Sequence, residues 1–341
     1  MLRIGIAFSA KPDNPSSDGP DDQYEEFDKA ETIEALAEAI RGDGHEVSLL
    51  GDGREFLQKM LDSPPDFVFN CAEGQGVSRN REARVPAVCE MLGIPYSGSD
   101  PLTMGAALDK DMARVFVDAW GGSCPNGVVF PVETPLEVVE EQIFELFVEN
   151  LSGIVILKPN LEGSSKGIRG ECLATTTEDA LKIYERLLRD YQQPILVEEF
   201  IDGDEVTVGV IGNGSEIKVL GIMKIIPKKS KGPFVYSLEV KRDYQRRVRY
   251  EAPAKYSESI QEMIEQAAIL AYTALGCRDV ARIDFRVHEH EEEVFFLEAN
   301  PLPGLAPITS DLVILAEGYG ISHGDLVRMI VQTALKRVGL S

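Results

Sequence analysis

The chain has 341 residues, of which 44% are hydrophobic, enough for a sizeable core divided among two or three folded domains. Its net charge of −23 argues against nucleic acid and anionic membranes as partners, because both require a basic surface. Five scattered cysteines without a CxxC pair predict neither a disulfide framework nor a zinc site. The lack of a long apolar segment argues against secretion and membrane insertion, so we expect a cytoplasmic protein.

The first hundred residues alternate between strand and helix patterns. Residues 2–8 read as a buried strand, and the polar stretch 10–22 reads as a long mobile loop. Apolar residues at helical spacing follow from Ile33 to Ile40, and strands are expected at residues 45–50 and 67–70. This order predicts a parallel sheet covered on both faces, with ligands at the carboxyl ends of its strands. We place the end of this first domain at residue 101.

Two further units are expected after residue 101. Residues 102–194 contain a helix carrying LDKDMARVF and a strand at 154–159, which predicts a small α+β domain. Residues 195–341 form the third unit, with strands expected at 195–200, 205–211, 217–226 and 280–287 and a helix at 257–275, and we interpret it as an antiparallel-sheet domain. The basic stretch 227–249 is too long and too polar for a simple turn, so we expect a mobile lid.

A hairpin between residues 281 and 304 predicts a metal site. If the polar run HEHEEE forms its turn, Val287 faces Phe295, and the same register places Asp284 opposite Glu298. Facing carboxylates repel each other unless a hard cation lies between them, and Asn300 adds an amide oxygen on the same face. The hairpin therefore predicts a Mg²⁺ site, or an ordinary hairpin with a solvated acidic face.

Nucleotide phosphates need an unusual cradle in this chain, because it has neither a P-loop nor a GxGxxG motif. The stretch KPNLEGSSKG, residues 158–167, offers a lysine at a strand end followed by small residues whose N–H groups can approach phosphate. It could also be an exposed turn, and its Gly163-x-Ser165-x-Gly167 formally matches the nucleophile elbow of serine hydrolases. The hydrolase alternative also needs a later histidine, and only His288, His290 and His323 follow.

Glu198, Glu199 and Glu205 border a predicted strand pair in VEEFIDGDEVTV. Such a strand can offer its backbone to an adenine edge and a carboxylate to ribose hydroxyls, or it can be a solvated edge strand.

Taken in order, GIPYSGSDPLTMGAALDKDMAR, ILKPNLEGSSKG, LVEEFIDGDEVTV, ARIDF and FLEANPLPGL resemble segments of the ATP-grasp superfamily, and within it the D-alanine–D-alanine ligase family of carboxylate–amine ligases. The resemblance covers nearly the whole chain. It implies an α/β and α+β ATP-grasp fold of three domains, an N-terminal parallel α/β domain (1–101), a central ATP-grasp subdomain (102–194) and a C-terminal domain with the catalytic and metal residues (195–341).

The resemblance also implies roles for individual residues. ATP would be bound by residues matching the family's phosphate, adenine and ribose contacts: Lys110, Lys158, Ser165, Glu198, Glu199, Ile201, Glu205 and Lys241. Mg²⁺, or Mn²⁺ in its place, would be held by Asp284, Glu298 and Asn300. Arg282 and the Gly304 N–H match groups that stabilise the tetrahedral intermediate, Lys241 belongs to the mobile loop, and Ser164 and Ser310 match loop and substrate contacts.

The implied reaction activates a carboxylate as an acyl phosphate with ATP and joins it to an amine, with amino acids or small peptides as substrates. Closure of the loop would exclude water. A homodimer is one assembly that the resemblance allows. D-alanine ligation and a catalytically inactive nucleotide-binding protein are the alternatives to a ligase with non-standard specificity.

Three departures from the family pattern fall at the amino acid site. The glutamate expected to bind the substrate ammonium has no clean match, since Phe27 falls near its place and Glu25, Glu26 and Glu31 are the nearby candidates. The stretch NCAEGQGVSRNREARVP replaces a His- and Gly-rich loop. Arg242 stands where a tyrosine is expected, and its guanidinium predicts a substrate with an extra anionic or accepting group.

Overall fold

The computed structural model describes residues 1–12, 19–149, 152–229 and 232–340. Part of the expected mobile loop, residues 13–18, lies outside this description, as do residues 230–231 of the expected lid. The N-terminal part contains β1 (Arg3–Phe8), α1 (Ala30–Gly42), β2 (Glu46–Gly51), α2 (Gly53–Asp62), β3 (Phe67–Cys71), α3 (Arg84–Leu92) and α4 (Pro101–Leu108).

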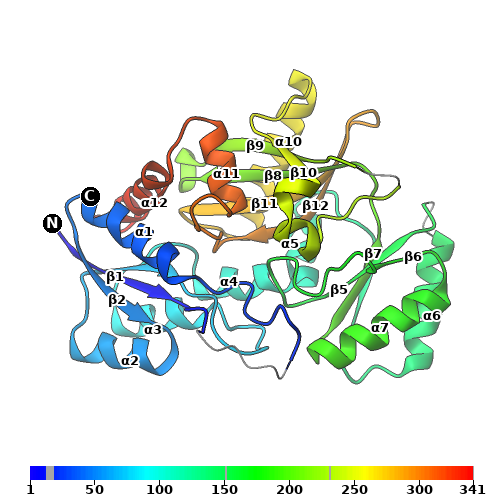
Figure 1. The fold of residues 1–341 in the computed structure, drawn as a ribbon, viewed down its shortest axis with the longest axis horizontal. Helices are drawn as coiled ribbons and strands as arrows, with labels where there is room; N and C mark the ends of the chain where they lie inside the picture. The colour runs from blue at the N-terminus through cyan, green and yellow to red at the C-terminus, as the bar shows by residue number, and fades with distance from the viewer. Residues whose placement is uncertain (13–18, 150–151, 230–231, 341) are drawn as a thin grey trace.

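The predicted parallel N-terminal sheet is confirmed, with strand order β2-β1-β3. Side chains alternate along β3, so Phe67 and Phe69 pack with α1 while Val68 packs with α2 and α3 on the other face. The face with α1 is completed by α12 (His323–Arg337) from the far end of the chain, and both termini lie at this end of the molecule (Figure 1).

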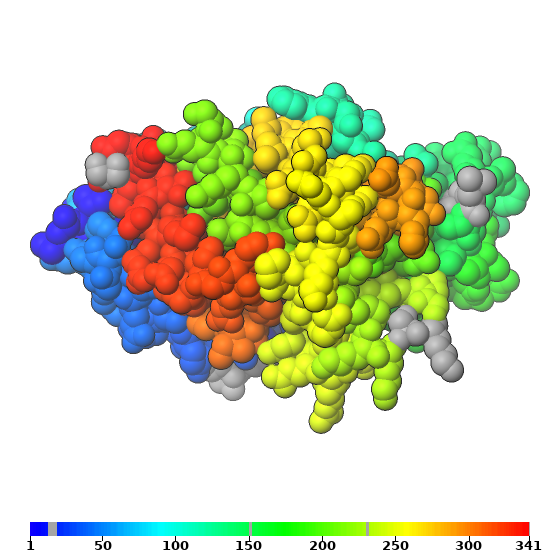
Figure 2. Space-filling model, turned by 90° about the horizontal axis from the view of Figure 1, so that it is seen from above, coloured from blue at the N-terminus to red at the C-terminus, as the bar shows by residue number. Residues whose placement is uncertain are grey.

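The central part has its own sheet and core. It contains β4 (Gly127–Phe130), α6 (Leu136–Glu149), β5 (Val155–Pro159), β6 (Leu173–Ala174), α7 (Thr177–Tyr191) and β7 (Ile195–Glu199), with strand order β4-β7-β5-β6. Apolar residues of α6 and α7, including Ile143 and Tyr184, pack on this sheet. These residues form the green end of the molecule, opposite the two termini in both views (Figures 1 and 2).

One expected strand belongs to a different sheet. The strand at 195–200 was assigned to the C-terminal antiparallel sheet, but β7 pairs with β4 and β5, so the expected boundary at residue 194 is too early. The sequence pattern alone could not decide to which sheet this strand belongs, because an apolar strand can pair with any strand that the fold places beside it.

The C-terminal part is built on a five-stranded antiparallel sheet with order β10-β9-β8-β11-β12. It contains β8 (Asp204–Ile211), β9 (Lys218–Pro227), α8 (Leu238–Arg242), α9 (Tyr244–Arg247), β10 (Val248–Glu251), α10 (Glu258–Ala274), β11 (Val280–His288), β12 (Glu293–Asn300), α11 (Asp311–Gly318) and α12. Helices α10 and α5 (Lys110–Ala119) share the core of one face, and α11 packs against β8 and β9. In the described part of the chain, no helix has the length and hydrophobicity needed to span a membrane.

Candidate active site

The β11–β12 hairpin brings its two acidic side chains together. Asp284 pairs with Glu298, as the alternation predicts. The register then shifts, so that Phe285 pairs with Phe296 and Val287 with Val294; the expected pairing of Val287 with Phe295 is therefore wrong by one residue. This register shift is a β-bulge between Asp284 and Phe285. It lets Phe285 and Phe296 point into the core, with ring centroids 6.2 Å apart, while Asp284 and Glu298 stay on the opposite face of the hairpin.

Cationic side chains surround this carboxylate pair. Arg282 donates to both oxygens of Asp284, at 3.1 Å from Nε to Oδ1 and 2.8 Å from Nη2 to Oδ2, and its Nη2 lies 3.5 Å from Glu298 Oε1. Lys110, the first residue of α5, places Nζ 3.1 Å from Glu298 Oε2. Burial acts to raise the pKa of Glu298, but the nearby Lys110 and Arg282 hold it below its ordinary value.

The donor set on this face fits a hard divalent cation. Asp284 and Glu298 supply carboxylate oxygens, and Asn300 donates its amide N–H to Glu298 at 3.4 Å, which leaves the amide oxygen as a ligand. These three residues would hold the metal ion. Such an ion would neutralise charge on the nucleotide's phosphates.

The residues expected to bind the nucleotide come together in a narrow cavity of about 70 Å³ between the central and C-terminal sheets. Lys158 lies on β5 with Nζ 2.5 Å from Glu198 Oε1 on the neighbouring β7. The remaining predicted residues that line this cavity are Ser165, Glu199, Ile201, Glu205 and Lys241, together with Asp284 and Glu298. Lys110 instead lines the larger cavity next to it.

Arg286 is a residue of the nucleotide cavity that the sequence did not reveal. Its Nη2 lies 2.7 Å from Glu205 Oε2, its Nη1 donates to the Gly203 carbonyl at 3.0 Å, and its guanidinium lies 5.1 Å from the Phe200 ring centroid. Burial raises the pKa of Glu205 above its ordinary value despite this partner. Arg286 shares the strand face of Arg282 and Asp284, so the two-residue alternation was the signal that could have found it.

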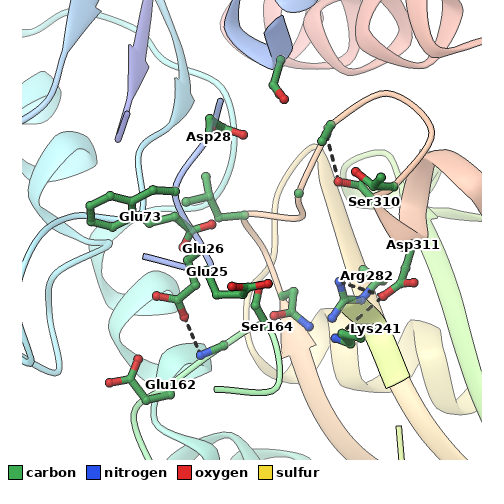
Figure 3. Close-up of a pocket in the computed structure, with 18 of the residues that line it drawn as sticks. Glu25, Glu26, Asp28, Glu73, Glu162, Ser164, Lys241, Arg282, Ser310 and Asp311 are labelled. Carbon is green, nitrogen blue, oxygen red and sulfur yellow. Dashed lines mark hydrogen bonds and ion pairs between the residues drawn. The ribbon is translucent and has the colours of Figure 1, made fainter. Parts of the chain in front are cut away.

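The second cavity, of about 700 Å³, opens between the three parts of the chain (Figure 3). Every residue predicted for catalysis or substrate binding lines it: Ser164, Lys241, Arg242, Arg282, Gly304 and Ser310. Ser310 precedes α11 and accepts a hydrogen bond from the Ala306 N–H at 2.9 Å. Its Oγ would lie 3.0 Å from a Cβ added at Gly304, so a side chain there would crowd the loop.

Asp311 and Tyr236 connect the expected lid to Arg282, and neither was foreseen. The Tyr236 hydroxyl donates to Asp311 Oδ1 at 2.9 Å, and Asp311 Oδ2 lies 3.9 Å from both Lys241 Nζ and Arg282 Nη1. Lys241 Nζ also lies 4.9 Å from the Tyr236 ring centroid. The Tyr236 ring and the Asp311 carboxylate thereby hold Lys241 beside Arg282, as Figure 3 shows for the three charged residues.

Arg242 does not present a free guanidinium to the cavity. Its Nη1 lies 2.8 Å from Asp21 Oδ2 and its Nη2 lies 2.8 Å from Glu25 Oε2, so its donors are used by carboxylates of the N-terminal part. That Arg242 binds an anionic group of the substrate stays a prediction, and such a group would compete with Asp21 and Glu25 for this guanidinium. The partners of Arg242 lie more than 200 positions earlier in the chain, where no sequence pattern connects them.

The three glutamates considered for the substrate ammonium have different surroundings. Glu26 is buried and accepts hydrogen bonds from the Gly163 N–H at 2.6 Å, from Arg81 at 3.2 Å and from Lys166 at 3.3 Å. Burial acts to raise its pKa, but Arg81 and Lys166 hold it below its ordinary value. Glu26 thus anchors the Ser164 loop to the N-terminal part, Glu25 pairs with Arg242, and Glu31 is exposed.

The serine hydrolase alternative has no geometric support. Ser165 donates its hydroxyl to the Tyr236 carbonyl at 3.0 Å, and its backbone φ is +58°. His323 contacts the Leu305 carbonyl, and His288 lies near the glutamates of the hairpin tip. In the described ranges no histidine is a hydrogen-bond partner of Ser165.

Comparison with known proteins agrees with this geometry. A family model described as "D-ala D-ala ligase C-terminus" matches residues 130–332. D-alanine--D-alanine ligases of Halalkalibacterium halodurans and Aquifex aeolicus are 32% and 31% identical to this chain, covering 89% and 88% of it and 92% and 93% of their own lengths. The uncharacterized protein y4sG of Sinorhizobium fredii is 31% identical and covers 89% of this chain and 87% of its own length.

Solved structures give the same fold. The D-alanine--D-alanine ligase of Bacillus anthracis complexed with ATP aligns with a TM-score of 0.71 at 20% identity, over 98% of each chain. The VanG D-Ala:D-Ser ligase of Enterococcus faecalis aligns with a TM-score of 0.70 at 21% identity, over 97% of this chain and 99% of its own.

The two antiparallel sheets of the central and C-terminal parts have the fold of these ATP-grasp structures, and the family model and the curated relatives make the chain an ATP-dependent ligase that forms ADP. Within that class, the chain belongs to the D-alanine–D-alanine ligase family.

Proposed function

We propose that this enzyme joins two amino acids by activating the carboxylate of the first as an acyl phosphate. The observation that carries the proposal is the meeting of Lys110, Lys158 and Lys241, from three separate elements, with the Asp284–Glu298 pair. Positive charge from three directions is what transfer of a γ-phosphoryl group requires. Mg²⁺ held by Asp284, Glu298 and Asn300 is the proposed metal ion, with Mn²⁺ as a substitute.

The residues of the large cavity account for the remaining steps. The substrate carboxylate attacks the γ-phosphorus, ADP leaves, and the amine of the second substrate then attacks the acyl carbon and displaces phosphate. Arg282, with the Gly304 N–H, lies where negative charge develops on the acyl oxygen. The segment with α8 and α9 covers the cavity through Lys241 and Arg242, which keeps water from the acyl phosphate.

D-alanine is the first substrate to test. The names of the relatives favour D-alanine for both partners over the anionic substrate that Arg242 suggested, because the Arg242 donors are already engaged. An inactive nucleotide-binding protein is less well supported, since Arg282, Asp284, Glu298 and Asn300 are all present and converge.

The test is ATP-dependent phosphate release with Mg²⁺ and D-alanine, followed by pools of D- and L-amino acids, with product mass measured in parallel. We expect amino acid-dependent release of phosphate with formation of an amide. ATP binding without amino acid-dependent release from any pool would refute ligase activity and support the nucleotide-binding alternative.

A further inference from the structure

Three carboxylates on the N-terminal side of the large cavity have no hydrogen-bond or ion-pair partner among the described residues. Asp28 precedes α1, Glu73 follows β3 and Glu82 precedes α3, and all three line the cavity. In the described part of the chain, none of the three side chains takes part in a hydrogen bond or an ion pair. Glu82 is only 7% exposed. Figure 3 shows Asp28 and Glu73 across the cavity from Arg282. We call Asp28, Glu73 and Glu82 the acidic chamber.

Two carboxylates next to the acidic chamber, Glu162 and Glu26, do have cationic partners within the protein. Glu162 accepts from Gln193 at 2.7 Å and from Lys166 at 2.5 Å, and Arg81 bridges Glu162 to Glu26 at 3.3 and 3.2 Å. Among the described residues, the ion pairs of Arg81 and Lys166 are with these two acids, while Arg81 acts on Glu82 and Glu73 only from a longer distance. A buried carboxylate without such partners is costly, which suggests that the partner of the acidic chamber comes from outside the protein.

Among the described residues, the other cations near the chamber form no ion pair with it, although Lys110 is close enough to act on the charge of Glu82. Lys11 and Lys29 also line the cavity, but both are exposed and neither forms an ion pair with the three acids. Lys110 donates to the Glu162 carbonyl and pairs with Glu298. In the described ranges no three acidic, histidine or cysteine side chains are arranged to hold a metal ion, so the chamber offers separate sites rather than one coordination point.

The electrostatic state of the chamber agrees with its geometry. Burial raises the pKa of Asp28 to about 7. Burial also raises the pKa of Glu82 to about 7, although the nearby Arg81 and Lys110 act to lower it, and burial with repulsion from Glu82 raises the pKa of Glu73 well above its ordinary value. A bound cation favours the charged form of each acid, so its binding is coupled to release of protons near neutral pH.

We propose that the first substrate carries a second cationic group, as a diamino acid or a short peptide with a basic side chain does. The inference rests on the proposed function. Its carboxylate would face Arg282, and its two positive groups would pair with Asp28, Glu73 and Glu82. D-alanine brings one ammonium and a methyl group, whereas the chamber offers three acids in a cavity of about 700 Å³, large enough for an extended side chain.

The test compares lysine with norleucine, which has the same carbon skeleton without the terminal ammonium, using both enantiomers of each and D-alanine. With ATP and Mg²⁺ present, we expect kcat/KM for phosphate release to be about tenfold or more higher for one lysine enantiomer than for its norleucine counterpart and for D-alanine, the effect of one charged hydrogen bond.

Variants test whether the chamber is the cause of this preference. Asp28→Asn, Glu73→Gln and Glu82→Gln should each reduce the lysine-to-norleucine ratio severalfold. Glu38→Gln makes the same change of charge on an exposed position of α1 that does not line the cavity, and it should leave the ratio unchanged. Thermal melting of every variant verifies that it is folded.

Calorimetry with a non-hydrolysable ATP analogue separates this inference from the proposed function. Lysine binding that releases protons, measured in buffers of different ionisation enthalpy, would support the chamber even if no substrate is turned over. Equal use of lysine, norleucine and D-alanine, or a ratio unchanged in all three chamber variants, overturns the inference and leaves the ligase activity standing. Absence of lysine binding in the calorimeter also overturns it.

Discussion

At the scale of single residues, the hairpin face holds two carboxylates whose charges are balanced by Arg282 and Lys110. Thr207 on the neighbouring strand β8 also donates its hydroxyl to Asp284, so the side chain is fixed before any ligand binds. Fixed oxygen ligands are what a small, hard cation requires, because it tolerates little deviation from its preferred geometry.

We predict that Asp284→Asn or Glu298→Gln lowers kcat by about 100-fold or more, because charge on the transferred phosphoryl group is no longer neutralised. Glu293→Gln, at the exposed tip of the same hairpin, is the matched control. Steady-state phosphate release measures the effect, and circular dichroism verifies the fold. Turnover like that of the wild type in either site variant would contradict the metal assignment.

Asp28 links the site to stability. Its pKa is raised by burial from 3.8 to about 7, so the folded protein binds this proton more tightly than the unfolded chain. Stability is therefore lost as the pH rises from about 4 to about 7. Asp28→Asn should raise the free energy of unfolding at pH 8 by on the order of 2 kcal/mol, allowing for partial exposure, and change little at pH 4.

Urea denaturation at the two pH values measures this difference, with Glu38→Gln as the exposed control. A variant no more stable than the wild type at pH 8 would show that Asp28 carries no burial cost.

At the scale of elements, the segment between β9 and β10 connects two distant parts of the chain. Helix α8 carries Lys241, which faces Asp311, and Arg242, which pairs with Asp21 and Glu25. Apolar contacts add to these pairs, since Leu238 is buried and Tyr236 packs with Tyr250 on β10. The basic composition of the segment predicted a lid, and the structure supplies the contacts through which it would close.

We predict that residues 228–247 are cleaved by trypsin in the free protein and become protected by a non-hydrolysable ATP analogue, because Lys241 then contacts phosphate. The rate of cleavage, followed by mass spectrometry, measures the change. Equal rates with and without the analogue would argue against closure over the nucleotide.

Arg242→Ala should increase the cleavage rate in the free protein by about fivefold, the effect of losing about 1 kcal/mol of partly exposed ion pairing. Arg249→Ala is the matched control, because Arg249 pairs locally with Glu251 on the same strand. An unchanged rate in Arg242→Ala would mean that its pairs with Asp21 and Glu25 do not hold the segment.

At the scale of the whole molecule, the N-terminal and C-terminal parts share one core while the central part has its own. Residues of α12 such as Ile330 pack with Leu36 of α1 and Phe69 of β3, and Figure 2 shows the two ends of the chain side by side. Ile143 belongs to the separate core of α6 and α7. Polar contacts such as those of Arg81 with the Leu161 carbonyl and with Glu162 join the central part to the N-terminal part. A homodimer stays a prediction, which light scattering tests.

We predict that Ile330→Ala lowers stability by about 2–5 kcal/mol and speeds hydrogen exchange in both α1 and α12, because the cavity lies in their shared core. Ile143→Ala makes the same truncation in the central core and should speed exchange only there. Mass spectrometry of exchange resolves the three parts. Faster exchange of α12 alone in Ile330→Ala would show that the two parts unfold independently.

The sequence by itself determined the features that depend on local pattern. Alternation placed Asp284 opposite Glu298, and helical and strand periodicity predicted the parallel N-terminal sheet. The ordered motifs predicted a set of nucleotide-binding residues, and all of these except Lys110 line one cavity. These depend on neighbours a few positions apart or on spacings along the chain, where periodicity is informative. Within such patterns a one-residue bulge is invisible, which is why the hairpin register beyond Asp284 was wrong.

Only the tertiary structure decided which charges meet. It paired Arg242 with Asp21 and Glu25. It also left the three acids of the acidic chamber without ion-pair partners in the described part of the chain. The pairing of β7 with the central sheet was likewise decided only by the tertiary structure. Whether a charged side chain is neutralised depends on groups within about 4 Å in space, contributed here by segments many tens or hundreds of positions apart. The proposed substrate preference depends on those pairings, so the sequence alone predicted the class of reaction but not which charged side chains of the cavity lack a partner within the described residues.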